Sequence, residues 1–397
     1  MRGGFQQMEN ISFGQSREFL YSTALLTPAY PAEKTDGSRE KEQAEKLNAF
    51  LKQQGLDTQV ESITLGPVVN RFELNITPGL DVSLLAGYQN EIAREMNVRD
   101  VRLEVPIPGT TMIGIEVPHE KLHPVMLREV MESEEMKSAP GPLSVALGRD
   151  VAGRPVVCDL ERMPHLMMCG ITAIGKSNLL NCIILSLLHR NKPQELQLML
   201  YDGTGAEFNE YTGLPHLMGG KVQNDAMNMM EQLKELRLEM QRRYELFREK
   251  GVPNLSGYNA ALKQGETMLP RIVCIVDNFS DLMLPFRTEA EETLCVLAVL
   301  GRGAGIHVVL SCQRAVPQLI TGSLKAHFSS RIAFMCTVAG DSRVFLDRTG
   351  AERLAFRGDM LYMPSSSHGP IRVQGCYAPQ EDIWRVCQAL MDSSKTE

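Results

Sequence analysis

The sequence predicts an α/β fold, in which a parallel sheet with helices on both faces follows a smaller α/β module. Beyond residue 165, short apolar runs of strand length alternate with longer segments whose apolar residues recur at helical spacing. Before residue 120, strand-like runs are separated by the turn pairs Gly66-Pro67 and Pro78-Gly79. A chain of 397 residues, 43% hydrophobic and 22% charged, is long enough for two or three domains.

The first 150 residues are predicted to hold a lead segment and the smaller module. Residues 1–41 are polar and end in a charge-rich stretch, which indicates a flexible lead or linker. Residues 42–150 form the predicted module, whose best candidate for a linker is the segment SAPGP at 138–142. The elements expected in this module are a helix over 42–54, strands over 62–79, a helix over about 82–96, strands over 101–107 and 113–117, and a short helix over 124–133.

Residues 151–397 are predicted to form a nucleotide-binding core. Gly170, Gly175, Lys176 and Ser177 fit the pattern G-x-x-x-x-G-K-[ST]. A buried strand is expected over 166–169 and a helix after the loop, so strand, loop and helix follow in the required order. Such a loop turns successive N–H groups toward an oxyanion, and the helix adds its positive dipole end. A glycine turn with no ligand is the alternative.

ATP with Mg²⁺ is the ligand predicted for this loop. Lys176 would reach the β- and γ-phosphates, and the Ser177 hydroxyl would ligate Mg²⁺. The residues expected to contact the nucleotide are Gly170, Ile171, Thr172, Ala173, Ile174, Gly175, Lys176, Ser177 and Asn178.

The β-branched strand RIVCIV at 271–276 delivers Asp277 at its carboxyl end. This is the expected place for the second carboxylate of a P-loop enzyme, which holds Mg²⁺ through water. The alternative is an Asp that caps the next helix. In ATPases of the RecA-like kind a Glu commonly follows this Asp as general base, but here the next residue is Asn278, whose amide cannot accept the proton. Either another carboxylate serves, with Asp281 and Glu207 as candidates, or hydrolysis is severely slowed while ATP binding survives.

Further strands and helices complete the predicted core. Gln313 stands just after one of the strands, where a residue that senses the γ-phosphate belongs, although Gln-Arg after a strand is often ordinary surface. The expected elements are strands over 196–201, 306–311, 331–337, 359–363 and 371–374, and helices over 224–247 and 287–301.

Composition excludes several classes of protein. The sequence contains no run of 18 or more apolar residues, so no membrane span is predicted. The N-terminus lacks the apolar region of a secretory signal. The nine cysteines form no C-x-x-C pair and are expected to be buried free thiols, so we expect a cytoplasmic protein. The net charge of −7 gives no positive support for nucleic-acid binding, although a ring can place its basic groups in the lumen.

Many collinear segments resemble the FtsK/SpoIIIE family of DNA translocases, and they cover about four-fifths of the chain. They include GPVVNRFEL, VRLEVPIPG, VALGRDVAGRPVVCDLERMPHL, the glycine loop, VDNFSDLM, GRGAGIHVVLSCQR, TGSLKAHFSSRIAF and DSRVFLDRTGAERL. The resemblance implies a smaller α module followed by a RecA-like β module that assemble as a hexameric ring around double-stranded DNA. It also implies that Gln313 occupies the sensor position and Asp277 the magnesium position.

In such rings the nucleotide lies between subunits, and an arginine from the neighbour stabilises the charge of the transition state. The arginines on matching segments are Arg302, Arg331 and Arg343, each of which has a phosphate contact within its own subunit or a salt bridge as its alternative role. Neither the family's membrane-spanning N-terminus nor its C-terminal winged-helix module is expected in this chain.

Three departures from the family pattern put hydrolysis in question. Asn278 stands where the family has Glu, Ala173-Ile174 replace a Gly-Ser pair, and YDGTGAEF replaces an Asp-Pro-Lys segment. Three functions therefore stay open: an ATP-driven DNA translocase, a ring that binds ATP but hydrolyses it poorly and acts as scaffold or regulator, and a protein-export motor of the type VII kind. The biological role among chromosome segregation, plasmid transfer and phage transfer is left open as well.

Overall fold

The computed structural model describes most of the chain. The described residues are 19–30, 37–66, 69–75, 82–98, 100–107, 109–119, 124–171, 173–355, 357–367 and 369–393, without the side chains of residues 173 and 174. Most of the predicted lead, the turn residues Pro67, Pro78 and Gly79, and the loop residue Thr172 lie outside this set.

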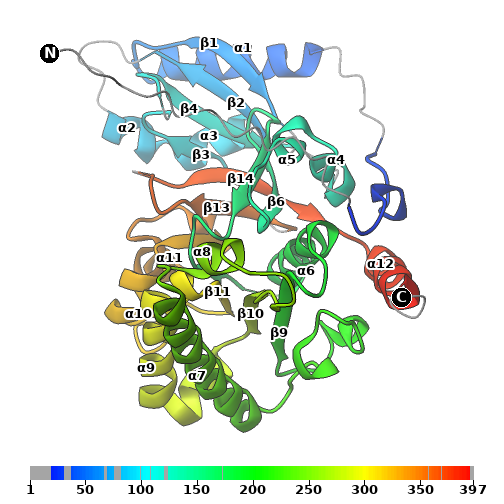
Figure 1. Cartoon of the computed structure of the whole chain (residues 1–397). Helices are drawn as coiled ribbons and strands as arrows, with labels where there is room; N and C mark the ends of the chain where they lie inside the picture. Colours follow the sequence, from blue (N-terminus) through cyan, green and yellow to red (C-terminus); the bar gives the residue numbers. More distant parts are fainter. Residues whose placement is uncertain are drawn as a thin grey trace, which may run out of the picture.

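The smaller of two sheets is antiparallel and carries its helices on one side (Figure 1). Its strand order is β1-β2-β4-β3, and its apolar core includes Leu47, Phe72 and Ile115. The helix predicted over 82–96 is two helices separated at Tyr88, because the first ends at Gly87, a residue that costs conformational entropy inside a helix. The elements are α1 (Ser38–Gln53), β1 (Val60–Leu65), β2 (Val69–Leu74), α2 (Val82–Gly87), α3 (Gln89–Glu95), β3 (Arg102–Glu104) and β4 (Ile113–Pro118).

The larger sheet has the order β7-β6-β14-β13-β12-β8-β11-β10-β9, with β5 paired to β14. Its strands β12, β8, β11, β10 and β9 are parallel, and β13, β14, β6 and β7 extend it as antiparallel neighbours. The strands are β5 (Val125–Met126), β6 (Ser144–Asp150), β7 (Pro155–Asp159), β8 (Leu166–Cys169), β9 (Leu196–Asp202), β10 (Arg271–Asp277), β11 (Ile306–Cys312), β12 (Ser330–Phe334), β13 (Asp359–Met363) and β14 (Ile371–Tyr377).

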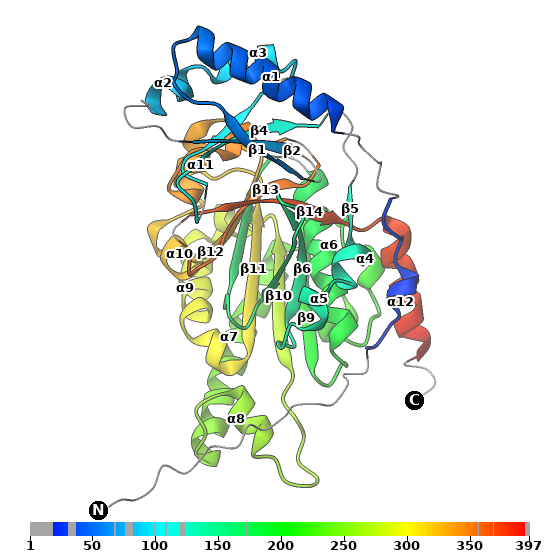
Figure 2. The ribbon, with the colours of Figure 1, turned by 90° about the horizontal axis from the view of Figure 1, so that it is seen from above.

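Two apolar cores fill the two faces of the large sheet (Figures 1 and 2). Residues of α6 (Ala173–Arg190) and α12 (Gln380–Ser393) belong to one core, and those of α7 (Ala226–Lys250) and α9 (Ser280–Ala304) to the other. The remaining helices are α4 (Leu127–Met131), α5 (Glu134–Lys137), α8 (Leu255–Ala260), α10 (Gly322–His327), α11 (Ala339–Leu346) and short 3₁₀ turns at Thr23–Leu25, Asn209–Tyr211, Met218–Gly220 and Ala351–Arg353. The predicted α/β fold with a parallel central sheet is confirmed.

Two expected helices differ from the structure in detail, and one expected boundary is not decided by it. The helix expected over 124–133 is the short strand β5 followed by α4. The helix expected from 287 starts at Ser280, because Pro285 is tolerated at a kink next to Phe286 (φ −122°, ψ 28°) instead of marking a boundary. The sheets change over between Pro118 and Val125, so β6 belongs to the larger sheet, and the division of the chain at residue 150 stays a prediction.

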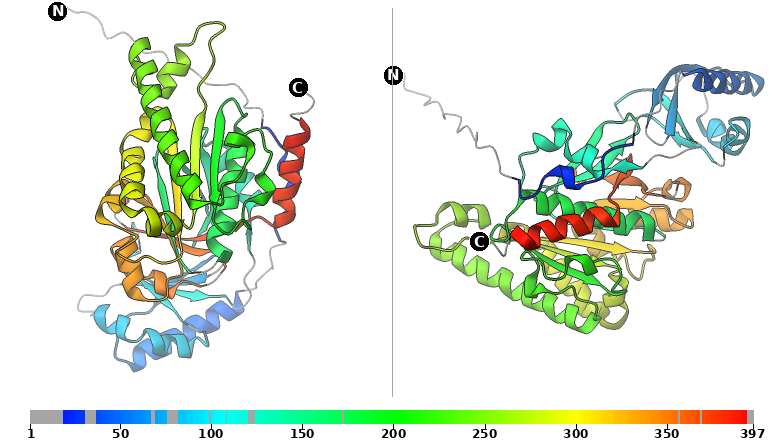
Figure 3. Two further views of the ribbon diagram at one scale, coloured as in Figure 1. Left: turned by 90° about the horizontal axis from the view of Figure 1, so that it is seen from below. Right: turned by 90° about the vertical axis from the view of Figure 1, so that its right-hand side faces the viewer.

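The first described segment of the chain lies beside its last helix. Residues 19–30 lie beside α12, where the Thr27 N–H and hydroxyl donate to Asp382 at 2.8 and 2.7 Å (Figure 2). Helix α8 lies at the end of the molecule opposite the smaller sheet (Figure 3). Across the described residues, no helix combines the length and the apolar content that crossing a bilayer requires.

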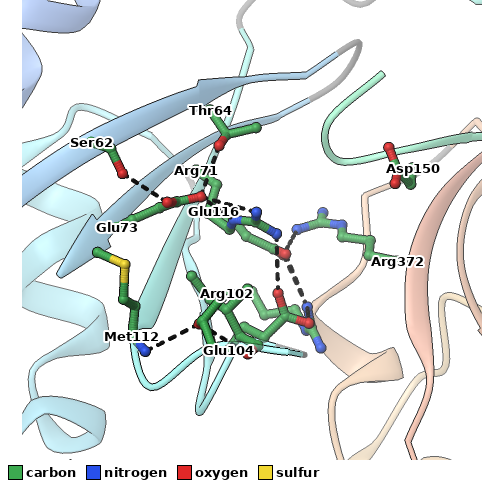
Figure 4. Close-up of polar contacts among 12 residues, drawn as sticks. Ser62, Thr64, Arg71, Glu73, Arg102, Glu104, Met112, Glu116, Asp150 and Arg372 are labelled. Atoms are coloured by element: carbon green, nitrogen blue, oxygen red, sulfur yellow. Dashed lines mark hydrogen bonds and ion pairs between the residues drawn. The ribbon is translucent and has the colours of Figure 1, made fainter. Parts of the chain in front are cut away.

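A buried cluster of charges joins the two sheets (Figure 4). Glu116 of β4 has no exposed side-chain surface and accepts hydrogen bonds from Arg102 at 3.1 Å and from Arg372 of β14. Arg372 also donates to Asp359 of β13 at 2.7 and 2.9 Å. Arginine guanidiniums suit such an arrangement because their planar donors can satisfy several carboxylates at once. The smaller module is thereby fixed to the antiparallel part of the larger sheet.

Two buried histidines predict that the fold is sensitive to acid. His165 and His307 are each 1% exposed, and burial lowers their pKa values to about 3 and about 4. Both rings form hydrogen bonds in their neutral form. His165 Nδ1 accepts from Val308 N at 3.1 Å, and His307 Nδ1 lies 3.0 Å from the carbonyl of Pro164. Since the folded pKa values lie below the unfolded value, the unfolded state binds more protons below pH 6.5, and stability falls as pH drops from about 6.5 to 4.

We expect the free energy of unfolding to fall by about 1.4 kcal/mol per pH unit for each of these histidines in that window. Urea unfolding curves between pH 7.5 and 4.5 measure this slope. His307→Asn keeps a donor for Pro164 while it removes the titrating ring, so it should reduce the slope by the share of one histidine. An unchanged slope in this variant would contradict the prediction.

Candidate nucleotide-binding site

The glycine loop leaves the carboxyl end of β8, which lies between the parallel strands β12 and β11, and enters α6. Gly170 has φ 153° and donates its N–H to the carbonyl of Cys312 at 3.2 Å. A Cβ at position 170 would lie 2.7 Å from Cβ of Phe334, and a Cβ at position 175 would lie 2.6 Å from Cδ1 of the Phe334 ring. Both glycines are therefore required because the loop packs directly on Phe334 at the end of β12.

The buried cation of the loop is Lys176, which is 3% exposed. Its Nζ donates to the carbonyl of Gly170 at 2.7 Å, so the side chain lies back over the loop. Burial lowers the pKa of Lys176, and the nearby charge of Asp277 opposes that effect. The 18-residue helix α6 begins at the loop, so its free N–H groups and the Lys176 charge favour the same anion.

Four carboxylates gather around the loop. Asp277 and Asp202 end the neighbouring strands β10 and β9 in register, and Asp277 accepts a hydrogen bond from the Ser311 hydroxyl. Glu207 is hydrogen-bonded to Ser177, and burial followed by the charges of Asp277 and Asp202 raises its pKa. Burial also raises the pKa of Asp277. The fourth carboxylate belongs to Asp281, at the start of α9.

The fit of this site to Mg²⁺ can be judged from its donor atoms. The Ser177 hydroxyl and the carboxylates of Asp277 and Glu207 are hard oxygen donors, which Mg²⁺ prefers, and it usually keeps several waters. No group of three or more His, Cys, Asp or Glu side chains in the described part of the chain is arranged to hold a metal by itself. The residues therefore suit a Mg²⁺ that is completed by water and nucleotide oxygens.

Asn278 and both candidate replacements for the missing Glu lie at this edge of the sheet. Asn278 has φ 57° and donates its side-chain N–H to Asp281 at 2.8 Å. Asp281 also lies 3.5 Å from the Tyr201 hydroxyl, and burial raises its pKa. Glu207 is instead held at Ser177. The two candidates thus occupy different positions, one beside Asn278 and one beside the predicted metal ligand.

The predicted sensor and arginines divide into those near the loop and those away from it. Gln313 is exposed and directly follows Cys312, whose carbonyl binds the loop. Arg343 is exposed on α11, and Arg302 is exposed in the last turn of α9, at the opposite edge of the sheet. Arg331 is 9% exposed and donates to the carbonyl of Phe345 and to Asp347 at 3.0 Å. These contacts give Arg331 a salt-bridge role within its own subunit.

Several residues that shape the site were not predicted from the sequence. Phe334, the last residue of β12, packs against the loop, and the carbonyl of Met335, the next residue, accepts from Ile171 N at 3.0 Å. Asp202 fixes the following loop by accepting from Thr204 N at 3.0 Å and Glu207 N at 2.7 Å. Asp202 directly follows the strand predicted over 196–201, just as Asp277 follows the strand predicted over 271–276. This position in the sequence could have identified Asp202 as a residue of the site.

A cavity of about 470 Å³ lies between the smaller module and the core. It is lined by Arg102 and Glu116 from the smaller module and by Met335, Arg353 and Arg372 from the core, among others. Met335 lines this cavity, and its carbonyl accepts a hydrogen bond from Ile171 N. One residue therefore connects the interface between the modules with the glycine loop.

Comparison with known proteins identifies the family. The model of the FtsK/SpoIIIE family matches residues 126–317, and that of the FtsK alpha domain matches residues 20–119. "DNA translocase FtsK" of Caldanaerobacter subterraneus subsp. tengcongensis is 40% identical over 369 residues, which are 93% of this chain and 52% of that protein. The chain belongs to the FtsK/SpoIIIE family. "DNA translocase SpoIIIE" of Bacillus subtilis is 36% identical over 99% of this chain and 50% of its own length.

The chain thus spans about half the length of the FtsK and SpoIIIE proteins that it matches. Among solved structures, the conjugation coupling protein TcpA of pCW3, a monomer with ATPγS, has a TM-score of 0.57 at 22% identity and covers 85% of this chain and 95% of its own. The cytoplasmic domain of the type VII secretion ATPase EccC of Thermomonospora curvata has a TM-score of 0.56 at 27% identity over 63% of this chain and 31% of EccC. These similarities support the RecA-like core that the FtsK/SpoIIIE resemblance implied.

Proposed function

We propose that this chain is the motor part of an ATP-driven translocase that moves along double-stranded DNA. The observation that carries the proposal is a strand, glycine loop and helix in succession, with Lys176, Ser177 and Asp277 gathered at one edge of the sheet, in a chain of the FtsK/SpoIIIE family. The relatives that match most of this chain are named DNA translocases. The match of residues 20–119 to the FtsK alpha domain extends the similarity to the smaller module.

In this proposal the loop N–H groups and Lys176 bind the β- and γ-phosphates, and Asn178 follows in the second turn of α6. Ser177 and Asp277 hold Mg²⁺, the latter through water, and Glu207 supports the Ser177 hydroxyl. Bound Mg²⁺ supplies positive charge to the phosphoryl oxygens as they gain negative charge. Gln313 directly follows Cys312, whose carbonyl accepts from Gly170 N, and would respond to the presence of the γ-phosphate.

We propose further that the chain assembles with copies of itself, as a hexameric ring with DNA in its centre, and that it works in the cytoplasm. Arg302 and Arg343 are the candidates for an arginine that acts on a neighbour's nucleotide, because both are exposed while Arg331 is bonded within its own subunit. Contacts with DNA would be mainly to phosphates, so the affinity should not depend on sequence and should fall steeply with salt.

A second candidate function is a ring that binds ATP but hydrolyses it poorly and acts as a scaffold or regulator. Asn278 favours it, because an amide does not take a proton from water at neutral pH. A protein-export motor is a third candidate, favoured by the similarity to EccC. The match of the smaller module to the FtsK alpha domain supports the DNA translocase over the export motor.

The deciding experiment is steady-state ATP hydrolysis at low salt with and without long linear duplex DNA. We expect DNA-stimulated turnover at motor rates, on the order of 1 to 100 per second. Asn278→Glu is measured beside it and should change turnover by less than about tenfold, since the wild-type site is already competent. Absence of ATP turnover in the wild type together with rapid turnover in Asn278→Glu would favour the scaffold function. A turnover rate that is the same with and without DNA would contradict translocation.

A further inference from the structure

Asn278 has an uncommon backbone conformation and is hydrogen-bonded through both its backbone and its side chain. Its φ of 57° lies in the left-handed region, which Asn adopts more readily than most residues. Its backbone N–H donates to the Ser311 hydroxyl at 3.3 Å, and that hydroxyl in turn donates to Asp277. The residue is therefore tied at its backbone to the carboxylate that is expected to hold Mg²⁺.

The orientation of the Asn278 amide follows from its partner. The side chain contacts Asp281 Oδ1 at 2.8 Å, and an ionised carboxylate can only accept hydrogen bonds. The NH₂ end must face Asp281, so the carbonyl oxygen Oδ1 of Asn278 points the other way. No hydrogen bond from a residue within the described ranges reaches that oxygen, and it remains free to accept one.

Asp281 is itself held by the segment that departs from the family pattern. The Tyr201 hydroxyl lies 3.5 Å from Asp281 Oδ2, and a Cβ at Gly203 would collide with the same oxygen. A side chain at position 203 is thus incompatible with the observed place of the carboxylate. Two departures, Asn278 for Glu and the segment at 201–208, meet at this one carboxylate.

We propose that Asn278, positioned by Asp281, orients the water that attacks the γ-phosphate of ATP. This inference rests on the proposed ATP-driven function. The Asn278 carbonyl accepts a hydrogen bond from the water, so the residue acts as a water-positioning group and not as a base. The water oxygen bonds to the γ-phosphorus, its proton passes to a γ-phosphate oxygen, and the bond to the bridging oxygen breaks with its electron pair left on ADP. The products are ADP and H₂PO₄⁻, and no side chain changes its charge.

A double-mutant cycle tests the pairing of the two residues. We expect Asn278→Ala and Asp281→Ala each to lower kcat on the order of 10- to 100-fold, because a misplaced reactant loses about that much, with KM within twofold of the wild type. The double variant should be no slower than Asn278→Ala alone, since Asp281 acts only through Asn278. Asp281→Asn retains an acceptor and should recover part of the loss. Multiplicative effects in the double variant would overturn the pairing.

A second readout does not need turnover. In the nucleotide-free protein, the side-chain amide resonances of Asn278 should shift in Asp281→Ala and in Gly203→Ala, and stay in place in the control Asp225→Ala at the start of α7. Unmoved resonances in both test variants would overturn the inference. A non-hydrolysable ATP analogue should bind Asn278→Ala, Asp281→Ala, Asp281→Asn and the double variant with Kd within twofold of the wild type.

The outcomes separate this inference from the proposed function. If the wild type hydrolyses ATP with DNA and both alanine variants keep its kcat, the inference fails and the motor function stands. If the wild type is inactive and only Asn278→Glu turns over ATP, the motor function of this chain fails and the inference fails with it.

Discussion

Replacing Lys176 by alanine is expected to lower DNA-stimulated ATP turnover by about 100- to 1000-fold, the scale at which removal of one charged or polar donor to a transition state is felt. Lys176 is the only buried lysine in the described part of the chain, and its Nζ lies 2.7 Å from the Gly170 carbonyl. The phosphates would lie within the same loop, where the low exposure of the cation strengthens its attraction to them. Without Lys176, the dipole of α6 and the loop N–H groups remain as the anion-binding elements.

Stability should respond differently from activity in this variant. Burial lowers the pKa of Lys176, which shows that the fold bears a desolvation cost for this charge. We therefore expect the urea midpoint of Lys176→Ala to equal or exceed that of the wild type. Lys192→Ala, at an exposed position just after α6, is the matched control and should leave turnover unchanged. Loss of turnover together with a large loss of stability would mean that Lys176 holds the fold and not the nucleotide.

The parts of the site that the sequence predicted are those that lie close together along the chain. The loop pattern, the strand before it and the helix after it are local, so their residue types identify them. Asp277 was predicted because a β-branched apolar strand ends directly before it. Confirmation of the α/β fold follows from the same local signals, since alternation of strands and helices determines a parallel sheet.

The contacts that the sequence left undetermined join residues far apart in the chain. Phe334 contacts the glycine loop, and Tyr201 meets Asp281 eighty positions later. Such contacts depend on which strands become neighbours, and the order β12-β8-β11-β10-β9 is not readable from spacing. Sequence alone named Glu207 and Asp281 as equal candidates, whereas the structure gives them different partners, Ser177 and Asn278.

Glu116→Gln is expected to be the most destabilising single change outside the site. The Glu116 side chain is completely buried, and Arg372, its partner from the larger sheet, is 6% exposed (Figure 4). Burial by itself would raise the pKa of Glu116, but Arg372 and Arg102 outweigh it and hold that pKa below its usual value. Removing one partner of a buried pair costs about 3–5 kcal/mol when the other charge is left alone, and because Arg372 keeps Asp359 we expect the lower end of that range.

Because these charges connect β4 with β13 and β14, we expect Glu116→Gln to loosen the smaller module from the core before either sheet unfolds. Urea unfolding should show an earlier first transition, and limited proteolysis should cleave the variant faster than the wild type. Glu42→Gln removes the exposed pair with Lys46 and serves as the control, with no measurable change expected. A single transition at the wild-type midpoint would show that other contacts, among them the ion pair of Arg353 with Asp100, are enough to join the modules. A shifted first transition would instead identify the Glu116–Arg372 pair as a link between the smaller module and the antiparallel strands β13 and β14.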